Sequence, residues 1–114
     1  MNSEQLQRLV VDALEEIKAV DVVALDVRCL TSIADAIVIA SGTSQRHVQS
    51  LADNVLRRAR EADVRPLGVE GEQAGDWVLV DLGDVIVHVM RPEVRDFYNL
   101  EKLWSVPAAS AIEA

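Results

Sequence analysis

The sequence predicts a single α/β domain in which one mixed β-sheet is flanked by helices. Its 114 residues fit one domain of ordinary size. Half of the residues are hydrophobic and 26% are charged, which is the balance of a globular protein with a real core. Helical and extended apolar patterns follow one another in the order helix, two strands, helix, three strands, helix, and this order favours a layered α/β fold.

The first half of the chain predicts two helices that enclose two strands. Asn2 and Gln5 resemble a capping box ahead of a helical stripe of apolar residues, and a second stripe begins near Ser44. The apolar runs Val22–Val27 and Ala36–Ala40 are expected to be strands, the second of them centrally buried. The second helix should therefore pack one face onto the sheet.

The second half predicts a short peripheral strand, a hairpin and a last helix. An extended segment runs from Pro66 to Gly71, and Trp77–Asp81 and Val85–Met90 then meet across a tight connection that contains a glycine. The helical pattern that begins at Pro92 continues to Trp104. We therefore expect a domain over residues 1–105 and a loose tail over residues 106–114.

The charge of the chain favours a basic partner over a nucleic acid or a membrane surface. A formal net charge of −8 repels phosphate and anionic lipid, although many acidic proteins are acidic only for solubility. The apolar runs are too short to cross a bilayer, the N-terminus lacks a signal pattern, and the lone Cys29 excludes an internal disulfide. We expect a cytoplasmic protein.

The residues that are able to carry chemistry do not form a catalytic or metal-binding pattern. The acids Asp81 and Asp84 flank a tight turn, but no Lys- or Arg-rich phosphate cradle lies beside them. The turn that begins at Ser41 matches neither the P-loop nor the dinucleotide fingerprint, and His47 and His88 lack a second ligand at metal-binding spacing. The expectation is a protein without enzymatic activity, cofactor or metal.

The few aromatic residues are candidates for binding instead. Trp77 follows a Gly-Asp pair, and Tyr98 lies between Asp96 and Glu101, so large rings stand beside anionic groups as they do in binding hot spots. Core packing of Trp77, Tyr98 and Trp104 is an equally good interpretation of the sequence.

Four segments taken together resemble the ribosomal silencing factor family, also called RsfS or Iojap-related. The segments are Ser41–Val48, Leu67–Gly71, Asp76–Met90 and Tyr98–Ser105. The resemblance extends from the first helix to Ser105. It implies an α/β fold related to nucleotidyltransferases but without their catalytic acids.

The resemblance also implies a function, a partner and a docking surface. The expected function is repression of translation under nutrient limitation, by binding the large ribosomal subunit through its basic fourteenth protein and blocking the small subunit sterically. The residues expected to dock are Trp77, Leu79, Asp81, Leu82, Asp84, Tyr98, Glu101 and Leu103. The alternatives are a metal-dependent nucleotidyltransferase-like enzyme and a homodimeric scaffold, and a homodimer of the free protein is compatible with silencing.

Overall fold

The computed structural model describes residues 1–99, without the side chains of Phe97 and Tyr98. Its elements follow the predicted order. They are α1 (Ser3–Glu16), β1 (Val20–Asp26), β2 (Ala36–Ser41), α2 (Gln45–Glu61), β3 (Gly68–Glu70), β4 (Trp77–Asp81), β5 (Val85–Met90) and α3 (Pro92–Tyr98). The predicted fold class is confirmed.

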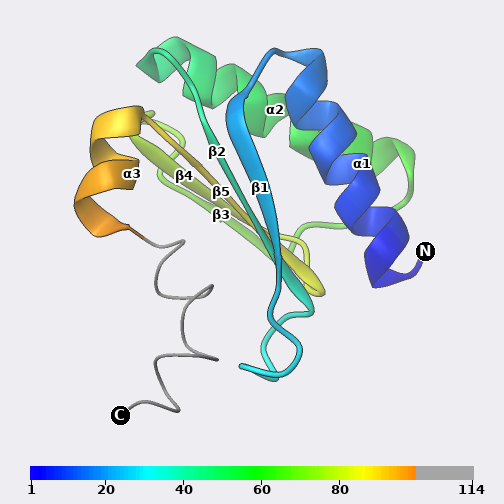
Figure 1. The fold of residues 1–114 in the computed structure, drawn as a ribbon. Coiled ribbons are helices and arrows are strands. Elements are labelled where there is room, and N and C mark those ends of the chain that lie inside the picture. Colours follow the sequence, from blue (N-terminus) through cyan, green and yellow to red (C-terminus); the bar gives the residue numbers. More distant parts are fainter. Residues whose placement is uncertain (100–114) are drawn as a thin grey trace, which may run out of the picture.

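The five strands form one mixed sheet in the order β1-β2-β5-β4-β3 (Figure 1). β2 and β5 pair in parallel, and the other neighbouring strands pair antiparallel. The predicted hairpin is β4-β5, in which Trp77 lies opposite Met90 and Asp81 lies opposite Ile86. As predicted, β2 is buried along its whole length and β3 is a peripheral strand.

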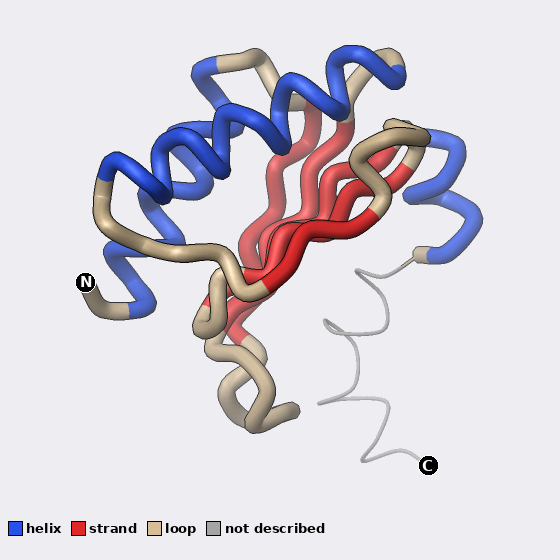
Figure 2. Tube along the Cα trace, turned by 180° about the vertical axis from the view of Figure 1, so that it is seen from behind, coloured by secondary structure: helices blue, strands red, loops and turns tan. Residues whose placement is uncertain are grey.

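One face of the sheet carries the main core. α1 and α2 lie side by side on this face, as Figures 1 and 2 show from opposite directions. Alternate strand residues point toward them because side chains in a strand alternate between the two faces. The strand residues of this core are Ala36, Val38, Ala40, Val78, Val80, Val85, Val87 and Val89. Most of the buried apolar residues thus lie between this face of the sheet and the two amphipathic helices.

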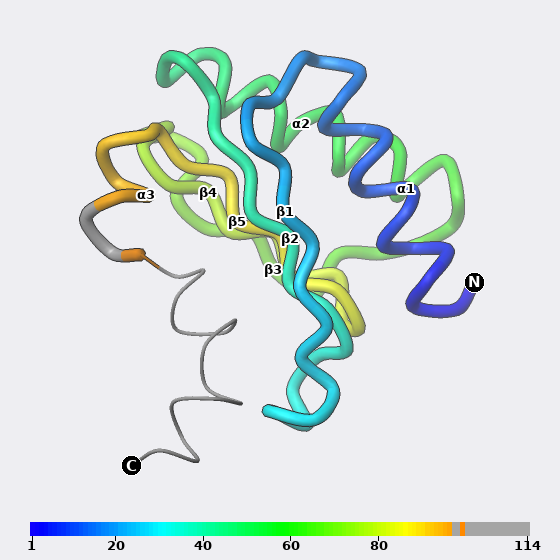
Figure 3. The backbone as a smooth tube through the Cα atoms, viewed as in Figure 1, coloured from blue at the N-terminus to red at the C-terminus, as the bar shows by residue number. Residues whose placement is uncertain are grey.

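The opposite face carries a smaller apolar cluster. Val27, Ile37, Ile39 and Met90 are buried there, and α3 packs Val94 against them. α3 lies at one end of the sheet, apart from α1 and α2 (Figures 2 and 3). Trp77 of β4 packs against the same cluster.

The helix starts follow the predicted capping pattern. Asn2 accepts a hydrogen bond from the backbone N–H of Gln5, whose side chain in turn accepts from the N–H of Asn2, which completes a capping box. Ser44 caps α2 by accepting from the N–H of His47. Both predicted capping positions are therefore correct, and α3 begins at Pro92 as predicted.

The last predicted helix is interrupted at Asn99. α3 ends at Tyr98, and Asn99 adopts a left-handed conformation with φ 52°, where its N–H donates to the carbonyl of Arg95. Asparagine tolerates this conformation better than most residues and therefore stops a helix without a glycine. The rest of the predicted helix, with Trp104, and the predicted tail lie outside the described residues.

Candidate protein-docking face

Strand alternation in β4 brings three of the predicted docking residues onto one surface. Val78 and Val80 point into the main core, so Trp77, Leu79 and Asp81 point to the opposite face of the sheet, where each is half-buried. Glu70 of the neighbouring strand β3 is register partner to Leu79 and is exposed. We call Glu70, Trp77, Leu79 and Asp81 the docking face.

Trp77 is anchored by a buried histidine of the next strand. Its indole Nε1–H donates to Nδ1 of His88 over 3.0 Å, and the two ring centroids lie 5.9 Å apart. Burial lowers the pKa of His88 from 6.5 to about 4. The histidine is therefore neutral at neutral pH, and its Nδ1 accepts a hydrogen bond from the indole N–H.

A shallow hollow lies beside the tryptophan. Glu70, Gly71, Trp77 and Leu79 line it, and its volume is about 290 Å³. Gly71 has φ +85°, and a Cβ atom added there would lie 2.0 Å from the carbonyl oxygen of Trp77. Only glycine lets the two backbone segments approach so closely. The hollow combines an apolar wall with one carboxylate.

Asp81, Leu82 and Asp84 occupy different environments in the hairpin turn. Asp81 accepts the backbone N–H of Gly83 over 2.9 Å and thereby stabilises the turn, in which Gly83 has φ +91°. Asp84 is exposed, at the end of the hairpin remote from Trp77. Leu82 is only 5% exposed and belongs to the main core, so its side chain does not form part of the docking face.

The acid that precedes Trp77 has its charge compensated. Asp76 lies 3.4 Å from the guanidinium of Arg91, and it also accepts a hydrogen bond from Gln45. Arg91 additionally pairs with Glu93 over 2.6 Å. The anionic character of the docking face therefore comes from Glu70 and Asp81 rather than from Asp76.

The remaining predicted docking residues cannot be placed on this face. The backbone of Tyr98 closes α3, but its side chain is outside the description, and Glu101 and Leu103 lie outside the described residues. Sequence reasoning missed Glu70 and His88 as contributors to the site. The alternation of side chains along β3 and β5 indicates which residues of each strand share a face. Only the order of the strands in the sheet shows that Glu70 and His88 are neighbours of Trp77 and Leu79.

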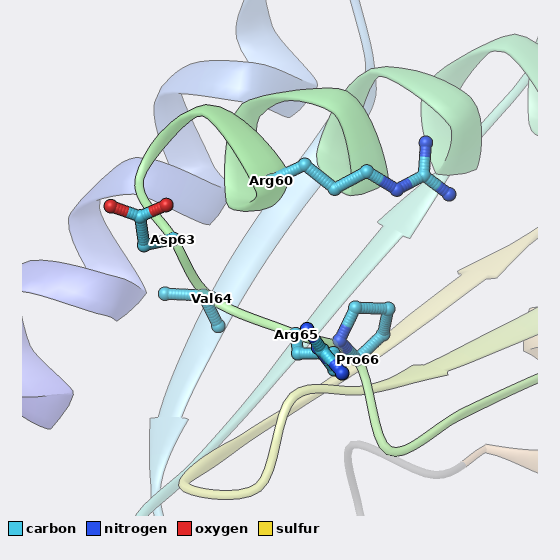
Figure 4. A pocket seen from close by; sticks show the side chains of 5 residues that line it. All are labelled: Arg60, Asp63, Val64, Arg65 and Pro66. Atoms are coloured by element: carbon cyan, nitrogen blue, oxygen red, sulfur yellow. The ribbon is translucent and has the colours of Figure 1, made fainter.

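Another hollow lies away from the docking face, where α2 leads into β3 (Figure 4). Its volume is about 320 Å³, and it is lined by Arg60, Asp63, Val64, Arg65 and Pro66. Across the described part of the chain, no three His, Cys, Asp or Glu residues gather as metal ligands. In the same residues no helix is long and apolar enough to span a membrane.

The fold and this face define a class of protein, namely a small α/β domain with a partly apolar, acidic surface on one face of its sheet. Comparison of the sequence with known protein families then identifies the family. The family described as "Ribosomal silencing factor during starvation" matches residues 1–114, and the chain belongs to it.

Individual relatives agree with this assignment. The ribosomal silencing factor RsfS of Chromobacterium violaceum is 46% identical over 104 residues, which are 91% of this chain and 85% of that protein. A crystal structure of a C. violaceum protein superposes with a TM-score of 0.91 at 46% identity, over 92% of this chain and 88% of that one. The more distant "Mitochondrial assembly of ribosomal large subunit protein 1" of Mus musculus is 34% identical over 101 residues, 86% of this chain and 44% of its own length.

Proposed function

We propose that this protein silences ribosomes by binding the large subunit through its basic fourteenth protein and excluding the small subunit. The observation that carries the proposal is the docking face, where the half-buried side chains of Trp77 and Leu79 lie near the carboxylates of Glu70 and Asp81. Family membership supports the ribosome as the target, and the name of the mouse relative refers to the large subunit.

The physical basis is an aromatic anchor with acidic neighbours. A large ring that fills a pocket of the partner contributes binding free energy, while carboxylates beside it orient lysines and arginines. An interface of about 1,200 to 2,000 Å² in total is sufficient for a specific complex. Asp84, Tyr98, Glu101 and Leu103 extend the proposed contact beyond the docking face.

Repression then follows from occupancy. A domain bound on the joining face of the large subunit takes up space that the small subunit needs, so no covalent step, cofactor or metal is involved. The protein acts in the cytoplasm in this proposal, and inhibition of subunit joining rises in proportion to the bound fraction of large subunits.

The test combines sedimentation with a joining assay. Purified protein is run with isolated large subunits on sucrose gradients, and small subunits are then added. Co-migration with the large subunit and loss of joined ribosomes are expected. A chain that fails to co-migrate, or that co-migrates without reducing joining, contradicts the proposal.

Replacement of Trp77 by Ala localises the interaction. A hot-spot tryptophan contributes about 2 kcal/mol or more, so affinity for the large subunit should fall about thirtyfold. Ile33→Ala is the matched control, because Ile33 is 75% exposed and lies outside the docking face. Equal affinities for the two variants would place the contact elsewhere.

A second copy of the chain is an alternative occupant of the same face. Half-buried apolar side chains on one face of the sheet suit pairing with a copy as well as with a ribosomal protein. In that case the free homodimer separates before it binds the ribosome. Light scattering with and without the purified ribosomal protein tests whether dimerisation and partner binding compete for this face. A dimer that persists in the complex would exclude such competition.

A further inference from the structure

We infer that His88 is a positioning residue for partner binding, which acts by holding the indole of Trp77 in one orientation on the docking face. The inference deepens the proposed function and depends on it, because it assigns to a buried residue a role in the affinity of an interface that this residue does not line.

Strand register makes the two side chains neighbours. His88 of β5 lies opposite Leu79 of β4, and Trp77 lies two residues away along β4 on the same face. Diagonal neighbours of this kind are within reach when the side chains are long or aromatic. The Nε1 to Nδ1 distance of 3.0 Å and the 50° tilt between the rings describe a directed hydrogen bond.

The chemistry of the pair fixes the direction of the bond. An indole nitrogen is only a donor, so Nδ1 of His88 must carry a lone pair and the imidazole proton must sit on Nε2. His88 is only 9% exposed and is held between Ile39 of β2 and Leu79 of β4. Burial also keeps this imidazole neutral, because it lowers its pKa to about 4.

A rigid acceptor beneath a half-buried ring affects binding through pre-organisation. Trp77 and Leu79 form the apolar wall of the hollow, so the orientation of the indole sets the shape that a partner side chain meets. An anchor that already has its bound rotamer loses less conformational entropy on association. Without the acceptor at His88, the indole loses this constraint on its orientation.

The first experiment observes the free protein and is independent of any partner. With Trp104→Phe as the background, Trp77 is the only tryptophan, so its indole N–H gives one signal in a ¹⁵N-correlated NMR spectrum. His88→Phe should shift this signal to that of an indole without the bond and increase ring mobility. His88→Gln keeps an acceptor oxygen and should restore most of the wild-type behaviour. An unchanged indole signal in His88→Phe overturns the inference.

The second experiment is a double-mutant cycle on affinity for isolated large subunits. Loss of one hydrogen bond that orients an anchor should weaken binding about fivefold in His88→Phe, and His88→Gln should recover it. In the Trp77→Phe background the same histidine replacement should change affinity no further, because the donor is already absent. His47→Phe is the matched control, since His47 bonds Thr43 and Ile17 away from the docking face.

The outcomes separate this inference from the proposed function. If Trp77→Phe and His88→Phe weaken binding independently, His88 does not act through the indole and the inference is wrong. If Trp77→Phe weakens binding and His88→Phe does not, the inference is again wrong while the proposed docking face stands. If the wild-type chain does not bind large subunits, the proposed function fails and the binding role of His88 fails with it, and the NMR result still decides whether His88 orients the ring.

Discussion

At the scale of single residues, one buried polar side chain and one glycine with positive φ shape the docking face. His88 supplies the acceptor for Trp77 from inside the sheet, and Gly71 permits the backbone contact beside the hollow. Neither residue stood out in the sequence, because a histidine among valines and a glycine in a polar turn are both ordinary. Their roles arise from which strands are neighbours.

The lowered pKa of His88 predicts a dependence of stability on pH. The unfolded chain binds a proton near pH 6.5 and the folded chain only near pH 4, so the unfolded state holds more protons between these values. The contribution is full above about pH 6.5 and is lost as pH falls toward 4. Urea unfolding should give a free energy about 2 kcal/mol lower at about pH 5 than at about pH 7.

His88→Gln is the control for this measurement, and it should flatten the profile over the same range. Hydrogen bonds from Asn54 and Arg58 lower the pKa of Glu16, and hydrogen bonds from Arg28 lower the pKa of Asp26, so the protonation of these two carboxylates falls below this pH range. A wild-type curve that is level from pH 7 to pH 5 would contradict the assignment.

The glycines of β3 and its turn predict a contrast between two alanine substitutions. Gly71→Ala forces a side chain into a left-handed conformation and against the carbonyl of Trp77, so a loss of about 2 kcal/mol or more in unfolding free energy is expected. At Gly68 an added Cβ meets nothing within 4 Å, so Gly68→Ala should change stability far less. Chemical denaturation of the two variants in parallel measures the difference.

At the scale of elements, the contact between α1 and α2 includes one buried amide among its apolar side chains. Asn54 of α2 is 5% exposed, and its Nδ2 donates to the carbonyl of Ala13 and to Glu16. Arg58 also pairs with Glu16. The elements themselves were predictable, because periodicity, capping residues and glycine turns are local signals, whereas this inter-helix bond joins residues 41 positions apart.

Asn54→Leu tests this helix contact. It removes the amide donor, leaves the carbonyl of Ala13 without this partner and inserts a branched side chain, so the unfolding free energy should fall by about 1 to 3 kcal/mol. Asp53 lies on the exposed side of the same helix, so Asp53→Ala should lower the unfolding free energy by less than half as much. Thermal and urea unfolding would contradict the prediction if the two variants were equally stable.

At the scale of the whole molecule, the net charge of −8 is expected to speed association with a basic ribosomal surface. Glu70 and Asp81 bring part of this charge to the docking face, while pairing with Arg91 compensates Asp76. Charge is a property of the composition, but its placement beside Trp77 depends on the sheet.

Salt should therefore weaken binding to large subunits in a way that depends on these acids. Glu70→Gln combined with Asp81→Asn should lower the association rate severalfold at low salt and reduce its salt dependence, measured at constant Mg²⁺. Glu4→Gln combined with Glu15→Gln changes the net charge equally on α1, on the other side of the sheet, and should have little effect. Equal effects of both pairs would mean that only total charge matters.

The sequence by itself determined the class of fold, the order of its elements, the hairpin and its turn, because each depends on residues close together along the chain. It also pointed to Trp77, Leu79 and Asp81. The tertiary structure decided which of the proposed residues share a surface: it placed Leu82 in the core, joined Glu70 to Trp77 and Leu79, and put His88 under the indole. The order of strands that are distant along the chain is set by packing between those segments, and no local pattern encodes it.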